Sequence, residues 1–302
     1  MNKKILEKLR LAGEIAQKAL KYAENLVKPG QKLLYICEKI EEMIIKEGGK
    51  PAFPLNISVN SIAAHYTSPP NDLRRLPNKG VVKIDLGVHI DGYIVDTART
   101  IILGGNYYKL VKASRSALDA AIQIVKDGVK VSEVGKVIEK EIIEMGFQPI
   151  KNLAGHVMER YNLHTGISIP NVSTKLSLLS PKFKEGMIVA IEPFATTGRK
   201  GIVVDTPEAY IYRLIKSNYT GTRTERKIAS YVYRRFKSLP FALRWMKNII
   251  QAKKSYEAFQ HLLKEKVLHK YPVLKDADNG VVSQMEDTLI VKKNSCEILT
   301  RK

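Results

Sequence analysis

Three aspartates stand in a segment that otherwise predicts a buried hairpin. Residues 82–99, VKIDLGVHIDGYIVDTAR, are rich in Ile and Val, as is typical of two paired strands. Asp91-Gly92 is a strong signal for a two-residue turn, because both residue types accept a positive φ. With the turn there, Asp96 faces Gly87 and lies diagonally across from Asp85. Two carboxylates so placed in an apolar sheet repel each other and lose hydration, so their charge must be relieved.

Three arrangements could relieve the two aspartates: a shared proton, a salt bridge from Arg99 or Lys83, or bound cations. Further candidate ligands downstream favour cations. His156 follows a small-residue turn, Glu192 lies in IVAIEPF, an apolar strand that ends in Pro193, and Glu286 lies in SQMEDTLIV, where it opens another strand. Four carboxylates and an imidazole are typical ligands for a pair of divalent ions such as Mn, Fe, Co or Zn. The sequence therefore predicts a metal centre whose ligands lie on strands or at strand ends.

An internal repeat indicates how the chain builds that frame. Helical patterns at 33–49 and within 128–149 each follow a glycine turn and precede short β-like segments. Shifted by 98 positions, the two stretches share identical residues, namely Gly30/Gly128, Lys32/Lys130, Ile40/Ile138, Glu41/Glu139, Ile44/Ile142, Ile45/Ile143, Gly48/Gly146 and Pro51/Pro149. The repeat predicts two related halves, each with helices followed by antiparallel strands.

A basic segment separates the last strands of the second half. Residues 209–271 contain 15 Lys or Arg against 3 Asp or Glu, a net charge of +12 out of +20 for the whole chain. Their pattern is helical and is broken at Pro240. We therefore expect a catalytic domain formed by residues 1–208 and 272–302, and a helical insertion at residues 209–271.

Composition restricts the class of protein. The chain has 302 residues, 44% of them hydrophobic, which is enough for a sizeable core. Its net charge of +20 favours contact with nucleic acid, ribosome or anionic membrane, and solvated lysine faces are the alternative. Cys37 and Cys296 are isolated, which predicts no disulfide and a reducing compartment. Without a secretory pattern or a long apolar run, a cytoplasmic protein with no membrane contact is expected.

The sequence resembles the dinuclear methionine aminopeptidases, and its insertion resembles that of the short, archaeal-style type 2 branch. The motifs that carry the resemblance are DLGVHIDGYIVDTA, GHVMERYNLHTG, IVAIEPF and SQMEDTLI. The resemblance implies an α+β pita-bread fold, in which a strongly curved antiparallel sheet is backed by helix pairs with pseudo-twofold symmetry. It also implies the metal ligands Asp85, Asp96, His156, Glu192 and Glu286.

The family pattern implies a role for each ligand. Asp85 chelates one ion, Asp96 and Glu286 bridge both ions, and His156 with Glu192 binds the partner ion. Hydroxide from a water between the ions would attack the methionyl carbonyl while Glu192 accepts and later returns a proton.

Five further residues match family positions around the substrate. His65 resembles the substrate-side histidine, and His164 the histidine at the scissile peptide. Phe53 and Phe194 resemble the walls of the methionine pocket, and Tyr271 is expected to close it. His89 is expected to be exposed near the hairpin turn, and no role is assigned to His261 or His269.

The resulting hypothesis is a monomeric enzyme that removes the initiator methionine from nascent polypeptides. Two alternatives stay open: an X-Pro aminopeptidase of the same fold, and a non-catalytic ribosome- or RNA-binding relative. We also expect the insertion to contact the ribosome or its RNA through basic residues such as Arg223, Arg226, Lys227, Arg234, Arg235 and Lys237.

Overall fold

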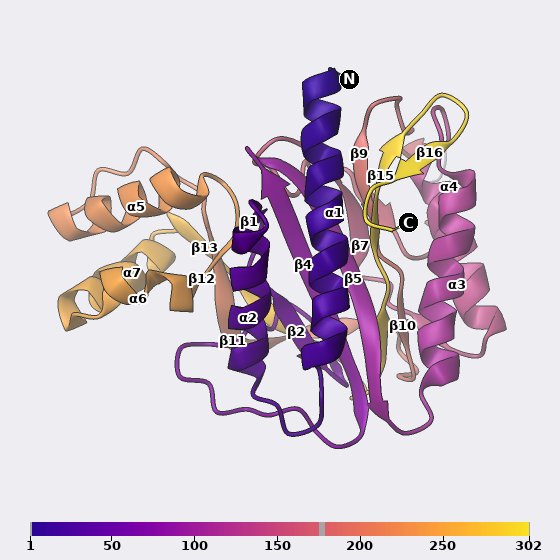
Figure 1. Ribbon diagram of the computed structural model, residues 1–302, viewed down its shortest axis with the longest axis horizontal. Helices are drawn as coiled ribbons and strands as arrows, with labels where there is room; N and C mark the ends of the chain where they lie inside the picture. The colour runs from indigo at the N-terminus through magenta and orange to yellow at the C-terminus, as the bar shows by residue number, and fades with distance from the viewer. Residues whose placement is uncertain (1, 175–178, 302) are drawn as a thin grey trace.

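The computed structural model describes residues 2–174 and 179–301. Antiparallel strands form the centre of the molecule, with helix pairs packed against each half and a helical lobe to one side (Figure 1). Helices α1 (Lys3–Leu26) and α2 (Leu33–Lys46) cover the first half, and α3 (Tyr108–Ile124) and α4 (Val131–Glu144) cover the second. Each pair buries one apolar face in its own hydrophobic core.

The hairpin of strands β4 (Gly80–Ile90) and β5 (Tyr93–Gly104) has the predicted register. Asp91 and Gly92 form its turn with φ values of 51° and 85°, and Gly87 pairs with Asp96. On its other edge β4 pairs with β1 (Lys50–Pro51) and β2 (Asn56–Val59). The hairpin is therefore the continuous element on which the first two candidate ligands stand.

The second half supplies the remaining candidate ligands from two further sheets. One sheet has the order β16-β15-β9-β7-β8, with β7 at Ala154–Met158, β8 at Ser168–Pro170, β9 at Ile188–Ile191, β15 at Asp287–Val291 and β16 at Cys296–Ile298. The other has the order β14-β10-β6, with β6 at Gln148–Pro149, β10 at Phe194–Thr196 and β14 at Val282–Gln284. A bridge between Ala98 and Glu286 joins the second half to the hairpin.

The two halves repeat each other in structure as well as in sequence. Every residue of α2 has its counterpart 98 positions later in α4, and β1 and β6 follow with the same offset. Gly48 and Gly146 end these helices with φ values of 89° and 83°, a conformation that favours glycine. The predicted α+β architecture of two related halves is confirmed.

The basic segment forms a lobe with its own hydrophobic core. Strands β11 (Val203–Leu214) and β13 (Leu268–Asp276) pair with each other, and β13 also pairs with β3 (Ile62–Ala64). Between β11 and β13 lie α5 (Arg223–Phe236), β12 (Phe241–Ala242), the 3-10 helix η2 (Leu243–Met246), α6 (Lys247–Ile250) and α7 (Lys253–Lys264). The helices thus occupy 223–264, whereas the two ends of the 209–271 segment are strands. No helix in the described part of the chain is both long and apolar enough to cross a membrane.

Candidate active site

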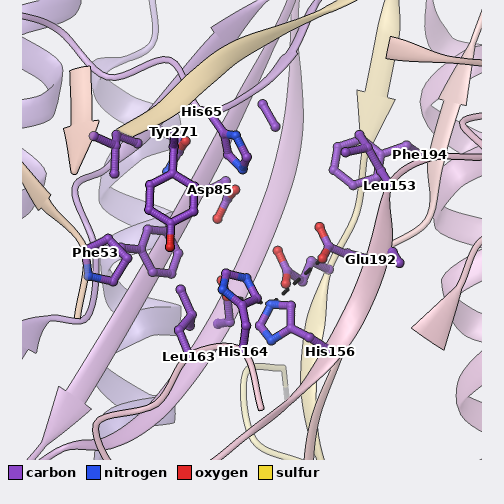
Figure 2. A pocket seen from close by; sticks show the side chains of 17 residues that line it. Phe53, His65, Asp85, Leu153, His156, Leu163, His164, Glu192, Phe194 and Tyr271 are labelled. Atoms are coloured by element: carbon purple, nitrogen blue, oxygen red, sulfur yellow. Dashed lines mark ion pairs between the residues drawn. The ribbon is translucent and has the colours of Figure 1, made fainter. Parts of the chain in front are cut away.

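The five candidate ligands, drawn from positions 85 to 286, line one pocket (Figure 2). Asp85 stands on β4, Asp96 on β5 and His156 on β7. Glu192 directly follows β9, and Glu286 lies between β14 and β15. Strands from both halves of the molecule therefore bring together residues that are far apart in sequence.

The distances between these side chains are short enough for shared ligation. The Nε2 atom of His156 lies 3.5 Å from Oδ2 of Asp96 and 3.9 Å from Oε1 of Glu192. Asp96, His156 and Glu286 each offer one potential ligand atom, and these three atoms lie within 4.8 Å of one another. An arrangement this tight requires either protons or cations between the carboxylates.

The pKa values of the clustered side chains and their unpaired polar atoms are both consistent with a site for divalent cations. Burial raises the pKa of Asp96 to about 8 and lowers that of His156 to about 4, so the imidazole is neutral and free to act as a ligand. Burial first, and the neighbouring carboxylates second, raise the pKa values of Asp85, Glu192 and Glu286 well above their usual range. The buried Oδ1 atoms of both aspartates and Nδ1 of His156 have no hydrogen-bond partner among the described residues. These oxygen and nitrogen donors suit one or two divalent ions.

The nearby cationic side chains point away from this cluster. Nζ of Lys83 donates to the backbone oxygens of Asn60 and Val282, both at 2.9 Å. Arg99 forms an ion pair with Asp287, at 2.6 Å between Nη2 and Oδ1. Neither side chain forms the salt bridge to Asp85 or Asp96 that the sequence left open.

Aromatic and imidazole rings form the rest of the pocket. Phe53, His65 and Tyr271 lie on one side in Figure 2, and Phe194 lies opposite them. The His65 and Tyr271 rings are 5.5 Å apart, and Nδ1 of His65 lies 3.2 Å from the backbone oxygen of Pro272. The exposed His164 ring is centred 4.4 Å from the His156 ring.

Several pocket residues were not predicted, chiefly Asn56, Leu153, Leu163, Ile211 and Pro240. They are apolar or neutral, and no spacing distinguishes them from ordinary core residues. One sequence feature is related to the pocket, namely the glycine at position 87, which was predicted to pair with Asp96. A β-carbon at Gly87 would lie 2.3 Å from Cε1 of Phe53. The missing side chain at that position makes room for the Phe53 ring.

The expectation that His89 is exposed was wrong. Its side chain is buried, and Nδ1 accepts the Gly92 backbone N–H at 3.0 Å. The Tyr161 ring packs edge-on against it, with the ring centres 5.7 Å apart. The loop after β7 covers this end of the hairpin, and that contact was not visible in the spacing along β4.

The fold is a curved frame of antiparallel strands, and it holds a buried cluster of carboxylates and an imidazole. Together these features indicate a metal-dependent hydrolase. The chain belongs to metallopeptidase family M24, whose model matches residues 7–292. The predicted enzyme class, a metal-dependent hydrolase, is thereby confirmed. The relatives described next confirm the resemblance to methionine aminopeptidases.

Individual relatives agree with this assignment. The methionine aminopeptidase of Pyrococcus horikoshii is 44% identical over 295 residues, which cover 98% of this chain and 99% of that protein. Among solved structures, a thermophilic Arx1 superposes with a TM-score of 0.84 at 20% sequence identity. The superposition covers 99% of this chain and 91% of the Arx1 chain. The methionine aminopeptidase of Thermotoga maritima gives 0.72 at 21% identity, with 100% and 98% covered. These structures share the fold, so the predicted pita-bread architecture is confirmed.

Proposed function

We propose that this protein is a metalloaminopeptidase that removes the initiator methionine from nascent polypeptides with two divalent cations. The observation that carries the proposal is the convergence of five oxygen and nitrogen ligands beside a pocket with aromatic walls. Neither feature alone specifies the substrate. Together they support peptide hydrolysis next to a site for one apolar side chain.

The ligands divide between the two cations according to the family pattern. Asp85 would hold one ion and His156 with Glu192 the other, while Asp96 and Glu286 would hold both. The short distances among Asp96, His156 and Glu286 support a shared ion at the His156 side of the pocket. When bound, the cations lower the pKa of water toward neutrality and polarise the scissile carbonyl.

The chain's own groups handle the proton and the substrate. Glu192 accepts the proton of the attacking water at a carboxylate oxygen and returns it to the leaving amine. His164, at the exposed edge of the pocket, donates a hydrogen bond to the carbonyl oxygen as its charge develops. His65 lines the opposite side and contacts the substrate peptide.

The walls of the pocket explain a preference for methionine at the first position. Phe53, Phe194 and Tyr271 offer apolar surface to an unbranched, polarizable thioether. The carboxylate cluster favours a free α-ammonium group nearby, which restricts cleavage to the first residue.

The direct test is methionine release from a Met-Ala-Ser peptide after chelation and readdition of Mn, Fe, Co or Zn. We expect activity from the wild type, and none from His156→Ala or Glu192→Ala. His261→Ala, an exposed histidine on the insertion, serves as the matched control and should retain activity. Two adjacent peaks in an anomalous difference map would support the paired ions, and full activity of His156→Ala would refute the site.

The same assay separates the alternative functions. Release from X-Pro peptides with no release from Met-Ala-Ser would favour the X-Pro aminopeptidase. Absence of any release, with an intact fold and bound metal, would favour the non-catalytic relative. The presence of all five ligand residues around the pocket supports the enzyme.

A contact with the ribosome or its RNA is proposed for the basic insertion. Arg223, Arg226, Lys227, Arg234 and Arg235 are exposed along α5, and Lys237 follows its end. Clustered cations of this kind bind phosphate backbones without reading sequence. Such a contact would bring the pocket close to nascent chain ends, and its salt dependence provides the test.

A further inference from the structure

Three segments that line the pocket belong to different parts of the chain and meet at one buried ion pair. They are the segment with Phe53 and Asn56, the segment with His65, and Pro240 of the insertion. We propose that the ion pair between Glu41 and Arg244 positions these walls and so sets the selectivity for the first side chain. This inference rests on the proposed aminopeptidase function.

Glu41 connects α2 to two of the segments. Its side chain is buried, and Oε1 accepts the Leu55 backbone N–H at 3.0 Å. Its Oε2 atom accepts the indole N–H of Trp245 at 2.8 Å, and Nη2 of Arg244 donates to Oε1. One carboxylate thus holds both the chain next to Asn56 and the start of η2 in the insertion.

Arg244 extends the connection to the third segment. Its Nη1 atom donates to Oγ1 of Thr67 at 2.7 Å and to the backbone oxygen of Ser68 at 3.0 Å. Thr67 lies two residues after His65, whose φ of 63° is unusual for a residue with a side chain. The planar guanidinium can hold both partners and the carboxylate at once, which a lysine ammonium cannot do in the same plane.

The insertion therefore forms part of the substrate pocket as well as a basic surface. Leu239, next to Pro240, is buried in one cluster with Phe53 and Leu163. Ser238 donates to the backbone oxygen of Tyr161, which provides a second attachment. If the insertion moved relative to α2, Pro240 and the Phe53 segment would move apart.

The internal repeat offers a matched control. Glu139 occupies the position in α4 that Glu41 occupies in α2, and its Oε2 atom accepts the Ser173 backbone N–H at 2.9 Å. Both glutamates thus anchor a loop by the same kind of bond. Ser173 does not line the pocket, so only the Glu41 contact should influence the substrate.

The test compares Arg244→Lys, Glu41→Gln and Glu139→Gln with peptides that begin with Met or Leu. Arg244→Lys keeps the positive charge and loses the planar guanidinium group with its several N–H donors. We expect KM for Met-Ala-Ser to rise about tenfold with kcat within about twofold, because a displaced wall weakens side-chain binding. The preference for Met over Leu in kcat/KM should fall about tenfold in Arg244→Lys and Glu41→Gln, and stay unchanged in Glu139→Gln.

The selectivity ratio separates positioning from a purely structural role. A lower melting temperature with an unchanged Met-to-Leu ratio in both pocket variants would overturn the inference. If either variant fails to fold, Trp245→Phe, which removes the indole N–H together with its five-membered ring, must shift the ratio in the same direction or the inference is wrong. A wild type that releases no methionine would refute the proposed function itself, whereas an active wild type with insensitive variants refutes only the positioning role.

Discussion

Four carboxyl groups and one imidazole share a small buried space, so the protonation of these side chains is coupled to cation binding. Asp96, with its pKa near 8, holds a proton at neutral pH in the absence of metal. The pKa values of Glu192 and Glu286 are raised in the same direction. A bound cation displaces such protons, and His156 is already neutral above its pKa of about 4.

Metal binding should therefore release protons and tighten as the pH rises from 6 to 8. The expected slope is about tenfold in Kd per pH unit for each proton released. Calorimetry in buffers of different ionisation enthalpy counts these protons. Asp96→Asn should release fewer protons than the wild type. A binding constant independent of pH would contradict the buried, protonated cluster.

Gly87 determines the position of Phe53. A methyl group added there would lie 2.3 Å from the ring, so Gly87→Ala must displace it. We expect a loss of about 1–3 kcal/mol in the free energy of unfolding and an increase in KM for Met-Ala-Ser. Gly128→Ala is the control. Its φ of 82° also strains an alanine, but the added methyl group would have no other atom within 4 Å. An unchanged KM in Gly87→Ala would show that Phe53 does not contact the substrate.

At the scale of elements, polar contacts from β5 to Glu286 and to Asp287 of β15 fix the relative positions of the two halves. Oγ1 of Thr97 donates to the backbone oxygen of Glu286 at 2.8 Å, and Nη1 of Arg99 donates to the same oxygen at 2.6 Å. Arg99 and Arg301 both pair with the fully buried Asp287. The candidate ligand Glu286 is therefore held through its backbone from the opposite hairpin.

Arg99→Met should destabilise the protein by about 3 kcal/mol, since it leaves Asp287 buried with fewer partners. It should also weaken metal binding, because Glu286 is then held by one hydrogen bond fewer. Lys8→Met removes an equally short ion pair, 2.6 Å to Asp91, that is exposed. That control should cost less than about 1 kcal/mol. Urea unfolding measures both variants, and equal reductions in stability would argue against the buried network.

For the whole molecule, the distribution of charge matters more than its total. The 209–271 segment carries +12 of the +20 net charge and projects to one side of the catalytic frame (Figure 1). If α5 contacts ribosomal RNA, binding measured by co-sedimentation should weaken steeply with salt. Removing one basic side chain that binds a phosphate should reduce the slope of log K against log salt by about 1.

Arg234→Glu/Arg235→Glu on α5 should therefore weaken ribosome binding and flatten its salt dependence. Lys136→Glu/Lys140→Glu changes the total charge equally on the exposed face of α4, and should leave the slope as it is. Equal effects of the two double variants would indicate non-specific attraction by net charge. Methionine release from a short peptide should persist in both.

Local signals in the sequence determined a large part of this fold. The Asp91-Gly92 turn and the alternation around it fixed the hairpin register, because side-chain direction in a strand follows from the period of two. The 98-residue repeat predicted two equal helices, since the glycine turns and apolar spacing that define them are short-range. The hairpin pairing, the strand positions of the other three residues and the family resemblance together predict the five candidate ligands.

Tertiary contacts decided what the side chains do with one another. Lys83 and Arg99 were possible partners for the acidic pair, and only packing shows that they bind backbone oxygens and Asp287 instead. Glu41 and Arg244 are separated by 203 residues along the chain, and no pattern in either helix indicates that they meet. Periodicity reports which face of an element is buried, whereas the choice of partner depends on how distant elements pack, and that is settled only in the folded molecule.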